Sequence, residues 1–194
     1  MSLAPKVILL DSCAYFRLAR SIHPLLAGTF GPPPPFSLFV LEALDDEYLT
    51  NSRLKNKFEW VNASAYRQDR AAKKYRCSGK WAAVANNAFS FLAAYAKNNG
   101  LLLAPEDLKA LAAGVARSLT VVSDDGALCR VASEHGIECW GTMELLKVMV
   151  DSGRITVAKV NEVLEYLDNQ NDLPMGRNEL RVRYRNLFGE KCPI

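Results

Sequence analysis

The sequence predicts an α/β protein whose sheet is mostly parallel and covered by helices on both faces. Two apolar runs, Lys6–Asp11 and Leu119–Asp125, have the composition of short buried strands, and each ends in a carboxylate. Between and after them, apolar residues recur at intervals of three and four, which is the period of helices. Strands that alternate with helices through short connections are typical of parallel sheets buried on both sides.

The chain is predicted to begin with a strand, a helix and a stiff connector. The strand covers Lys6–Leu10. A helix follows over Ser12–Ala19, with the Ser12 hydroxyl as its cap. The run Gly31–Pro35 contains four consecutive prolines and is expected to be extended.

The next stretch is predicted to be helical. The apolar segment Ser37–Leu44 is interpreted as a helix that carries Glu42 as its one central charge. A second helical stretch is predicted over Leu54–Asn99, with a division near Gly79. Its second half repeats apolar residues at helical spacing, so that half is expected to pack on the core.

The rest of the chain is predicted to alternate helices and strands. Pro105 lies near the first turn of one helix, and Gly136 closes another. Thr142 is expected to cap a third. In chain order the predicted elements are a helix to about residue 118, the strand that leads to Asp125, helix 126–135, strand 137–140, helix 143–151 and helix 158–168.

The composition is ordinary for a soluble globular protein, with 49% hydrophobic and 23% charged residues. No apolar run approaches the roughly 18 residues that span a bilayer. The apolar stretch Val7–Leu10 is too short for a signal peptide. The five cysteines are scattered singly, which argues against a disulfide framework or a zinc site. We therefore expect a cytoplasmic protein without a membrane partner, in which Cys13, Cys129 and Cys139 are small core residues.

The net charge of +3 is unevenly distributed along the chain. Nine lysines and arginines stand against two acids in the segment Arg53–Lys80. Five more basic residues stand against two acids in Arg177–Lys191, so the remainder of the chain is net acidic. A basic flank beside an acidic core is expected of an enzyme that binds a polyanion and cuts it with a metal.

Four acids are the candidate metal ligands: Asp11, Glu42, Asp107 and Asp125. Ligands bind beyond the carboxyl ends of strands in open α/β sheets, so Asp11 and Asp125 are expected to share a crevice. Gathered carboxylates repel one another and take up protons unless a cation neutralises them. Mg²⁺ and Mn²⁺ are hard cations that such oxygen ligands suit. Each acid alone also has a structural explanation, as a helix cap, a partner of the helix dipole or an ion-pair partner.

In their order and spacing these pieces resemble the PIN-domain nucleases, the group that includes the VapC-type toxins of bacterial toxin–antitoxin pairs. The matching pieces are the strand that ends in Asp11-Ser12, Glu42 in a second helix, Asp107 opening a helix, and Ser123-Asp124-Asp125 followed by residues 135–142. Asp107 precedes Asp125 by 18 residues, the spacing that the family shows. The resemblance covers about residues 5–150 and continues weakly into the tail as a helical hairpin.

The resemblance implies a three-layer α/β/α fold with strand order 3-2-1-4-5. It implies a catalytic domain over residues 1–150, which includes the basic segment 51–80, and a C-terminal helical extension over residues 151–194. The family further implies an RNA substrate, a homodimer and, for a toxin, a small antitoxin as partner.

The resemblance also assigns roles to the site residues. Asp11, Glu42, Asp107 and Asp125 would be catalytic and would bind one or two Mg²⁺ or Mn²⁺ ions. Asp124 is an additional candidate ligand, and the pattern Ser/Thr-x-Asp favours Asp125 over it. Ser123 matches the residue that orients the last carboxylate, and Ser12 is expected to support the first.

Six cations of the basic segment are expected to bind nucleic-acid phosphates. They are Arg67, Arg70, Lys73, Lys74, Arg76 and Lys80. Three functions remain open at this point: an endoribonuclease, a PIN-fold protein that binds nucleic acid without cutting it, and a structure-specific DNA nuclease with the same acids. Metal binding separates the first from the second, and a preference for flapped DNA over single-stranded RNA would identify the third.

Overall fold

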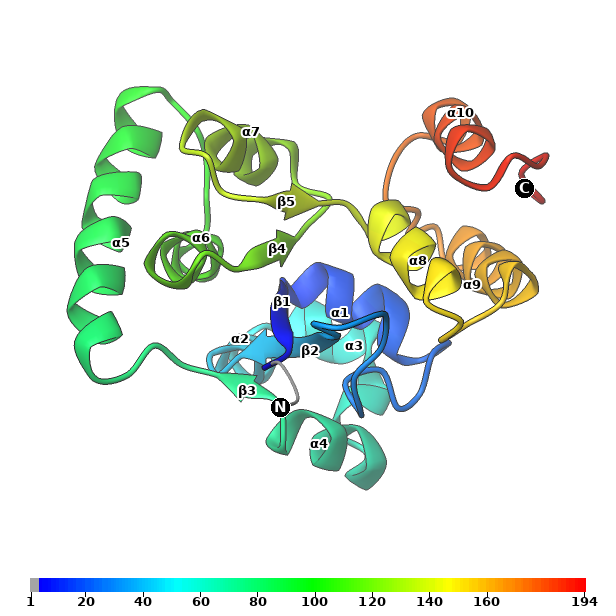
Figure 1. Cartoon of the computed structure of the whole chain (residues 1–194), viewed down its shortest axis with the longest axis horizontal. Helices are drawn as coiled ribbons and strands as arrows, with labels where there is room; N and C mark the ends of the chain where they lie inside the picture. The colour runs from blue at the N-terminus through cyan, green and yellow to red at the C-terminus, as the bar shows by residue number, and fades with distance from the viewer. Residues whose placement is uncertain (1–3) are drawn as a thin grey trace.

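The computed structural model describes residues 4–194 and contains one parallel sheet of five strands (Figure 1). The strand order is β3-β2-β1-β4-β5, so the predicted α/β class and the order 3-2-1-4-5 are confirmed. The strands are β1 (Lys6–Leu10), β2 (Phe36–Leu41), β3 (Lys74–Tyr75), β4 (Thr120–Val122) and β5 (Cys139–Trp140).

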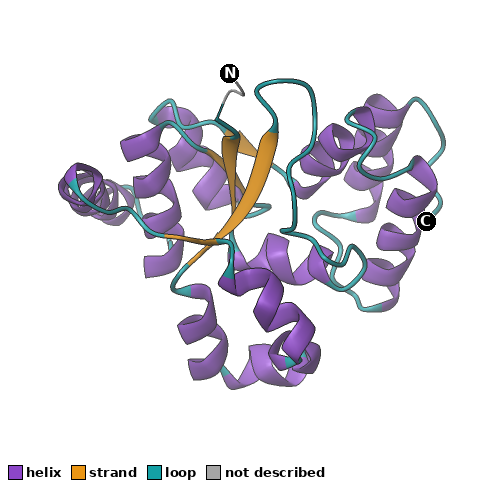
Figure 2. Ribbon diagram, turned by 60° about the horizontal axis from the view of Figure 1, so that its bottom comes forward, coloured by secondary structure: helices purple, strands orange, loops and turns teal. Residues whose placement is uncertain are grey.

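Helices cover both faces of the sheet (Figure 2). They are α1 (Ser12–Ala19), α2 (Leu44–Thr50), α3 (Ser52–Lys57), α4 (Ser64–Ala71), α5 (Lys80–Asn98), α6 (Pro105–Arg117), α7 (Gly126–Glu134), α8 (Thr142–Asp151), α9 (Val157–Asn169) and α10 (Arg177–Phe188), with a 3₁₀ turn at Glu59–Asn62. No helix within residues 4–194 is long and apolar enough to cross a membrane.

Alternation along the strands divides the interior into two cores. Ile8 and Leu10 of β1 point into a core shared with α1, α2, α8, α9 and α10. Leu9, between them, points into the opposite core with residues of α5, α6 and α7. This period of two is the geometry of a strand, and burial on both faces is what a parallel sheet requires.

The register brings the carboxyl ends of neighbouring strands together. Leu10, the last residue of β1, pairs with Val40 of β2 and with Val122 of β4. The amide of Asp11 then donates to the carbonyl of Val122 at 3.0 Å. Whatever follows β1, β2 and β4 in the sequence therefore lies at one edge of the sheet.

The C-terminal extension packs into the first of the two cores. Val160, Val163, Leu164 and Leu167 of α9 are buried there, and so is Tyr184 of α10. The extension therefore shares its hydrophobic core with α1 and β1, and the division of the chain at residue 150 remains a prediction.

The predicted helix over Ser37–Leu44 is wrong, because these residues form most of β2 and only Leu44 begins a helix. Leu38 and Val40 are buried in one core while Phe39 and Leu41 pack against the other. A strand buried on both faces has an unbroken apolar sequence, and periodicity does not distinguish it from a short buried helix. Glu42 therefore follows a strand and is not in a helix.

The predicted helix over Leu54–Asn99 is only partly correct. The division near Gly79 is confirmed, since this glycine has a φ of 57° and α5 begins directly after it. Before Gly79 the chain forms two short helices, a 3₁₀ turn and the two-residue strand β3. The Asn51 side chain caps α3 by accepting from the amides of Arg53 and Leu54, so a new helix starts there.

Candidate active site

Asp11 lies directly after β1 and is 8% exposed. Its Oδ1 accepts from the amide of Ala14 at 2.5 Å, so Asp11 caps α1. The prediction that Ser12 is the cap is therefore wrong. Burial raises the pKa of Asp11 to about 7, and the charges of Asp124 and Asp107 add to this rise, although hydrogen bonds from Ser123 and Ala14 oppose it.

Asp107 lies in the first turn of α6 and faces the same region as Asp11. Its Oδ2 accepts from the amide of Ala104 at 2.9 Å. Burial raises the pKa of Asp107, and the negative charges of Asp125 and Glu106 raise it further. Asp107 therefore adds a second carboxylate that lacks electrostatic compensation.

Glu47 of α2 is a third carboxylate of this region, half-buried like Asp107, and sequence analysis did not select it. The Ser12 hydroxyl donates to Glu47 Oε2, which explains where that hydroxyl goes when it does not cap α1. Burial raises the pKa of Glu47, and the charges of Glu106 and Asp107 act in the same direction. The signal that could have identified it is its position in the first turn of the helix after β2, which only a correct strand assignment reveals.

Glu42 occupies a different environment from Glu47. Its side chain is 53% exposed, and its Oε2 lies 3.6 Å from Nε of Arg76. It is not among the charges that shift the pKa of Asp11, Glu47 or Asp107. The exposed Glu42 thus differs from Asp11, Glu47 and Asp107, which are buried or half-buried.

The side chain of Asp124 is buried and binds Arg17 and Thr142. Its Oδ2 lies 2.7 Å from Nη1 of Arg17, and it also accepts from the Thr142 hydroxyl at 2.5 Å. The Thr142 amide donates to Oδ1 at 2.8 Å. Thr142 is therefore not the helix cap that we predicted, because Gly141 precedes α8 and its amide donates to Glu144.

Asp125 is exposed and caps α7, accepting from the amide of Leu128 at 2.8 Å. Its own amide donates to the hydroxyl of Ser123 at 3.1 Å. Ser123, which is fully buried, thus connects Asp125 to Asp11. Asp125 lies at the edge of the acidic site, where its charge reaches Asp107.

Asp11, Glu47 and Asp107 together form what we call the acidic site. None of the three has an ion-pair partner within residues 4–194. Buried carboxylates that repel one another and lack a cation are a donor set that suits a hard divalent metal.

The side chains of the acidic site do not form a closed ligand shell. Among the residues that the structure describes, no three His, Cys, Asp or Glu side chains stand close enough to hold one ion together. Mg²⁺ usually keeps several waters and is held by one or two carboxylates, and it seldom occupies a cage made of protein ligands alone. The residues present therefore fit a hydrated cation.

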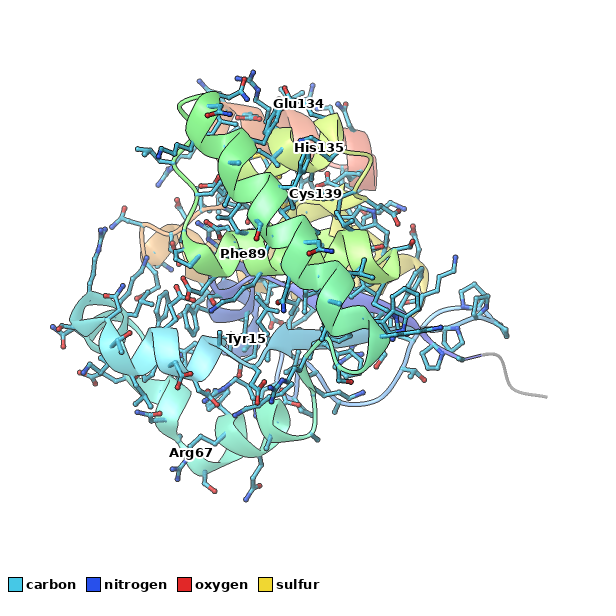
Figure 3. The ribbon with its side chains drawn as sticks, turned by 90° about the vertical axis from the view of Figure 1, so that its left-hand side faces the viewer. Tyr15, Arg67, Phe89, Glu134, His135 and Cys139 are labelled. Carbon is cyan, nitrogen blue, oxygen red and sulfur yellow. The ribbon has the colours of Figure 1, made fainter. Side chains whose placement is uncertain are left out.

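The six predicted phosphate-binding cations have unequal access to the surface. Arg70 is 2% exposed; it donates to Asp45 at 2.8 Å and to the carbonyl of Val61 at 3.0 Å, which makes it an internal residue. Lys74 also pairs with Asp45, and Lys73 donates to the buried Ser37. Arg67 is exposed on α4 and extends away from the body of the molecule (Figure 3).

The remaining two basic residues lie at the start of α5, Arg76 just before the helix and Lys80 as its first residue. Arg76 has an exposed side chain and its one ion-pair partner in the described part of the chain is Glu42. Lys80 is exposed and lies over the ring of Trp81, 4.9 Å from its centroid. Both remain accessible to an anionic ligand.

Two of the five cysteines contact each other, although they are 10 residues apart in the sequence and form no C-x-x-C motif. The sulfurs of Cys129 and Cys139 are 3.3 Å apart, and Cys129 donates to the carbonyl of Ser123. Both are half-buried, whereas Cys13 is exposed, so the prediction that Cys13 is a core residue is wrong.

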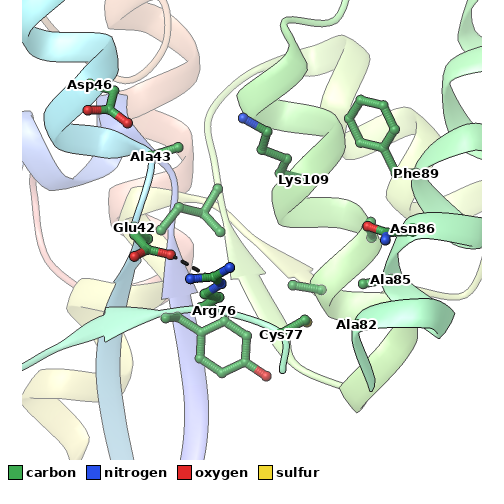
Figure 4. Close-up of a pocket in the computed structure, with 14 residues that line it drawn as sticks. Glu42, Ala43, Asp46, Arg76, Cys77, Ala82, Ala85, Asn86, Phe89 and Lys109 are labelled. Atoms are coloured by element: carbon green, nitrogen blue, oxygen red, sulfur yellow. Dashed lines mark ion pairs between the residues drawn. The ribbon is translucent and has the colours of Figure 1, made fainter. Parts of the chain in front are cut away.

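A cavity of about 550 Å³ lies beyond the carboxyl ends of β2 and β3 (Figure 4). Glu42 and Arg76 line one side of it, and Lys109, Asn86 and Phe89 line the other. Its position at the strand ends is where parallel α/β sheets bind their ligands.

Comparison with known proteins gives little beyond this geometry. No family model matches the chain, and no curated protein matches it. The chain is similar to a crystal structure of FitAcB from Neisseria gonorrhoeae. The match covers 70% of this chain and 97% of the FitAcB chain, with 17% sequence identity and a TM-score of 0.45. The chain is also similar to a crystal structure of VapBC2 from Rickettsia felis bound to a DNA fragment from its promoter. That match covers 70% of this chain and 98% of the other, with 10% sequence identity and a TM-score of 0.42. At these values the similarity carries no argument about activity, which has to come from the residues of this chain.

Proposed function

We propose that this protein is a metal-dependent endoribonuclease of the PIN-domain type. The observation that carries the proposal is the acidic site: one buried and two half-buried carboxylates without an ion-pair partner, at the carboxyl edge of a parallel sheet. Each of them accepts a hydrogen bond, but none has a cation to offset its charge, and such a group destabilises a fold unless a cation binds.

The residues that would hold Mg²⁺ or Mn²⁺ are Asp11, Asp107 and Glu47, with Asp125 at the edge. A bound divalent ion lowers the pKa of a coordinated water and stabilises charge on a phosphodiester. Asp11 is the most buried residue of this group, and the charge of Asp107 acts on it. Glu42, which the sequence resemblance assigned to the site, is replaced in this proposal by Glu47.

The neighbouring side chains would hold these carboxylates in place. Ser12 fixes one oxygen of Glu47 and leaves Oε1 for a water or a cation. Ser123 supports Asp11 on one side and the backbone of Asp125 on the other. Asp124, neutralised by Arg17 and Thr142, would anchor the loop that carries Asp125 rather than bind the metal.

RNA as the substrate is supported by the basic flank and by the resemblance of the sequence. Arg67, Lys80 and Arg76 are accessible cations of that flank, and they can contact phosphates. Arg70 is left out because it is buried against Asp45. The toxin role, the antitoxin partner, the homodimer and a cytoplasmic location remain proposals that rest on the sequence.

The proposal is tested by incubating the full chain with a panel of single-stranded RNAs in Mn²⁺, Mg²⁺ or EDTA, beside a flapped DNA. We expect RNA cleavage with either metal, none in EDTA, and none by Asp11→Asn. Asp151→Asn, at an exposed acid of α8, is the matched control and should cut like the native protein. Metal-independent RNA binding without cleavage would instead indicate a binding protein, and preferential cleavage of the flap would indicate a DNA nuclease.

A further inference from the structure

The cavity beyond β2 and β3 shares two structural elements with the acidic site. On α2, Asp46 lines the cavity while the next residue, Glu47, belongs to the acidic site. On α6, Lys109 lines the cavity while Asp107 belongs to the acidic site. The cavity and the acidic site are therefore formed in part by the same two helices.

The size of the cavity suits one unit of a polymer. Cavities that bind small molecules measure about 300–1,000 Å³, and this one, at about 550 Å³, lies inside that range. The cavity lies at the same edge of the sheet as Asp11, since β1 and β2 pair in register up to Leu10 and Val40 and the cavity is lined by the residues that follow.

The lining combines an apolar surface with a few polar groups. The apolar part consists of the Phe89 ring and small side chains from α5 and α6, among them Ala85, Ala112 and Ala113. Asn86 contributes an amide that makes no side-chain hydrogen bond within residues 4–194. Arg76 and Lys109 supply positive charge at the rim, each 3.6 Å from an acid, Glu42 and Glu106 (Figure 4). Two acids, Glu42 and Asp46, also line the cavity.

These groups match the parts of a nucleotide. An unstacked base is recognised by contact with an aromatic side chain and by hydrogen bonds to its edge. Phe89 offers the first and Asn86 the second, because an amide can both donate and accept. Lys109 and Arg76 can pair with the phosphates on either side of that base.

We propose that this cavity binds the base of the nucleotide next to the cleaved phosphate, with Phe89 and Asn86 as the residues that determine base preference. The assignment to cleavage rests on the proposed ribonuclease function, whereas binding of a nucleotide in the cavity does not. Arg67 and Lys80, which lie outside the cavity, would contact phosphates and so give affinity without base preference.

The first experiment measures the binding of 5′-AMP, CMP, GMP and UMP to the full chain in EDTA, by ligand-observed NMR. We expect at least one nucleotide to bind, with affinity reduced about tenfold in Phe89→Leu and in Asn86→Ala, within the range that base stacking contributes. The chain offers matched controls on the same helix: Phe91→Leu and Asn87→Ala change exposed residues that do not line the cavity, and they should bind like the native protein.

The second experiment compares the cleavage products of a randomised RNA for the same four variants. Asn86→Ala is expected to change the base found beside the cut, while Asn87→Ala leaves it unchanged. The proposal is overturned if Phe89→Leu and Asn86→Ala behave like their controls in both experiments, even if RNA is cut normally. If nucleotides bind and the two variants weaken that binding, but no RNA is cut, the binding site stands and the ribonuclease function fails.

Discussion

Two sets of carboxylates lie close together in this protein and have opposite surroundings. Asp45 and Asp124 are paired with arginines, at 2.8 Å from Arg70 and 2.7 Å from Arg17. Asp11, Glu47 and Asp107 have no such partner in the described chain, and burial raises the pKa of each of them. The paired set connects elements of the fold, while the unpaired set gathers at the carboxyl edge of the sheet.

Asp45 shows how ion pairing changes the pKa of a partly buried carboxylate. Burial alone would raise the pKa of Asp45, but hydrogen bonds from Lys74 and Arg70 and their positive charges outweigh it and hold the pKa below its usual value. Its partner Arg70 also donates to the Tyr15 hydroxyl at 3.2 Å, so one guanidinium joins α2, α4 and α1. Asp11 has no equivalent of Arg70 among residues 4–194, and the hydrogen bonds from Ser123 and Ala14 offset only part of the free energy cost of burying its charge. We infer that a ligand offsets it.

The largest expected effect is on catalysis, from Asp11→Asn. Removing one charge from the centre of the acidic site should lower the rate of RNA cleavage on the order of a thousandfold, since metal-held charge stabilisation is worth several kcal/mol. Asparagine is as good a helix cap as aspartate, so α1 should remain intact. Cleavage rates and circular dichroism measured on the same sample check this. Residual activity within tenfold of the native rate would remove Asp11 from the centre of the site.

The next effect is on stability, from Arg70→Met, which breaks the paired set. Removing one partner from a buried ion pair costs about 3 kcal/mol in the free energy of unfolding, because the other polar groups lose their donor. Urea unfolding followed by circular dichroism measures this loss. Arg67→Met is the control, since an exposed arginine should change the stability by less than about 0.5 kcal/mol. Equal stabilities of the two variants would mean that Arg70 is not the internal residue described here.

A third prediction separates the two glutamates near β2. Glu47→Gln should lower the cleavage rate about a hundredfold, at the lower end of what a positioned acid or base contributes. Glu42→Gln should change it less than about threefold, because Glu42 is exposed and lies outside the acidic site. Steady-state rates for the two variants check the assignment. The reverse ranking would restore the original prediction that Glu42 is the catalytic glutamate.

The contrast between Glu42 and Glu47 also shows where prediction from the sequence stopped. Asp11 and Asp107 could be predicted because each stands at a clear boundary, the end of β1 and the start of α6. Glu47 could not, because β2 is apolar on both faces and was taken for a helix, so no separate helix was predicted over Leu44–Thr50. The strand β3 has only two residues, too few for a periodic signal.

The ion pairs could not be predicted from the sequence for a different reason. Arg17 and Asp124 are 107 residues apart, and Arg70 and Asp45 are 25 residues apart. Arg70 and Arg67 look alike in a basic segment, yet one is buried and the other exposed. Only the packing of α4 against α1 and α2 distinguishes them, and no local pattern encodes it.

The smallest expected effect is on the pH dependence of stability in the absence of metal. The folded protein holds a proton on Asp11 up to a pH of about 7, whereas the unfolded chain releases it near 3.8, so this contribution to stability is lost as the pH rises through 7. From pH 5 to pH 8 the free energy of unfolding should fall by roughly 2 kcal/mol through Asp11 alone, and Glu47 and Asp107 act in the same direction. Asp11→Asn should flatten this dependence, and Mg²⁺ should raise the melting temperature at pH 8 much more than at pH 5, because protons compete with the metal for the same oxygens. The contrary outcome is a free energy of unfolding that does not change between pH 5 and pH 8, with no response to Mg²⁺ at either pH. It would mean that the unpaired carboxylates are already neutralised within the chain. The difference between the two sets of carboxylates would then give no evidence of a metal site.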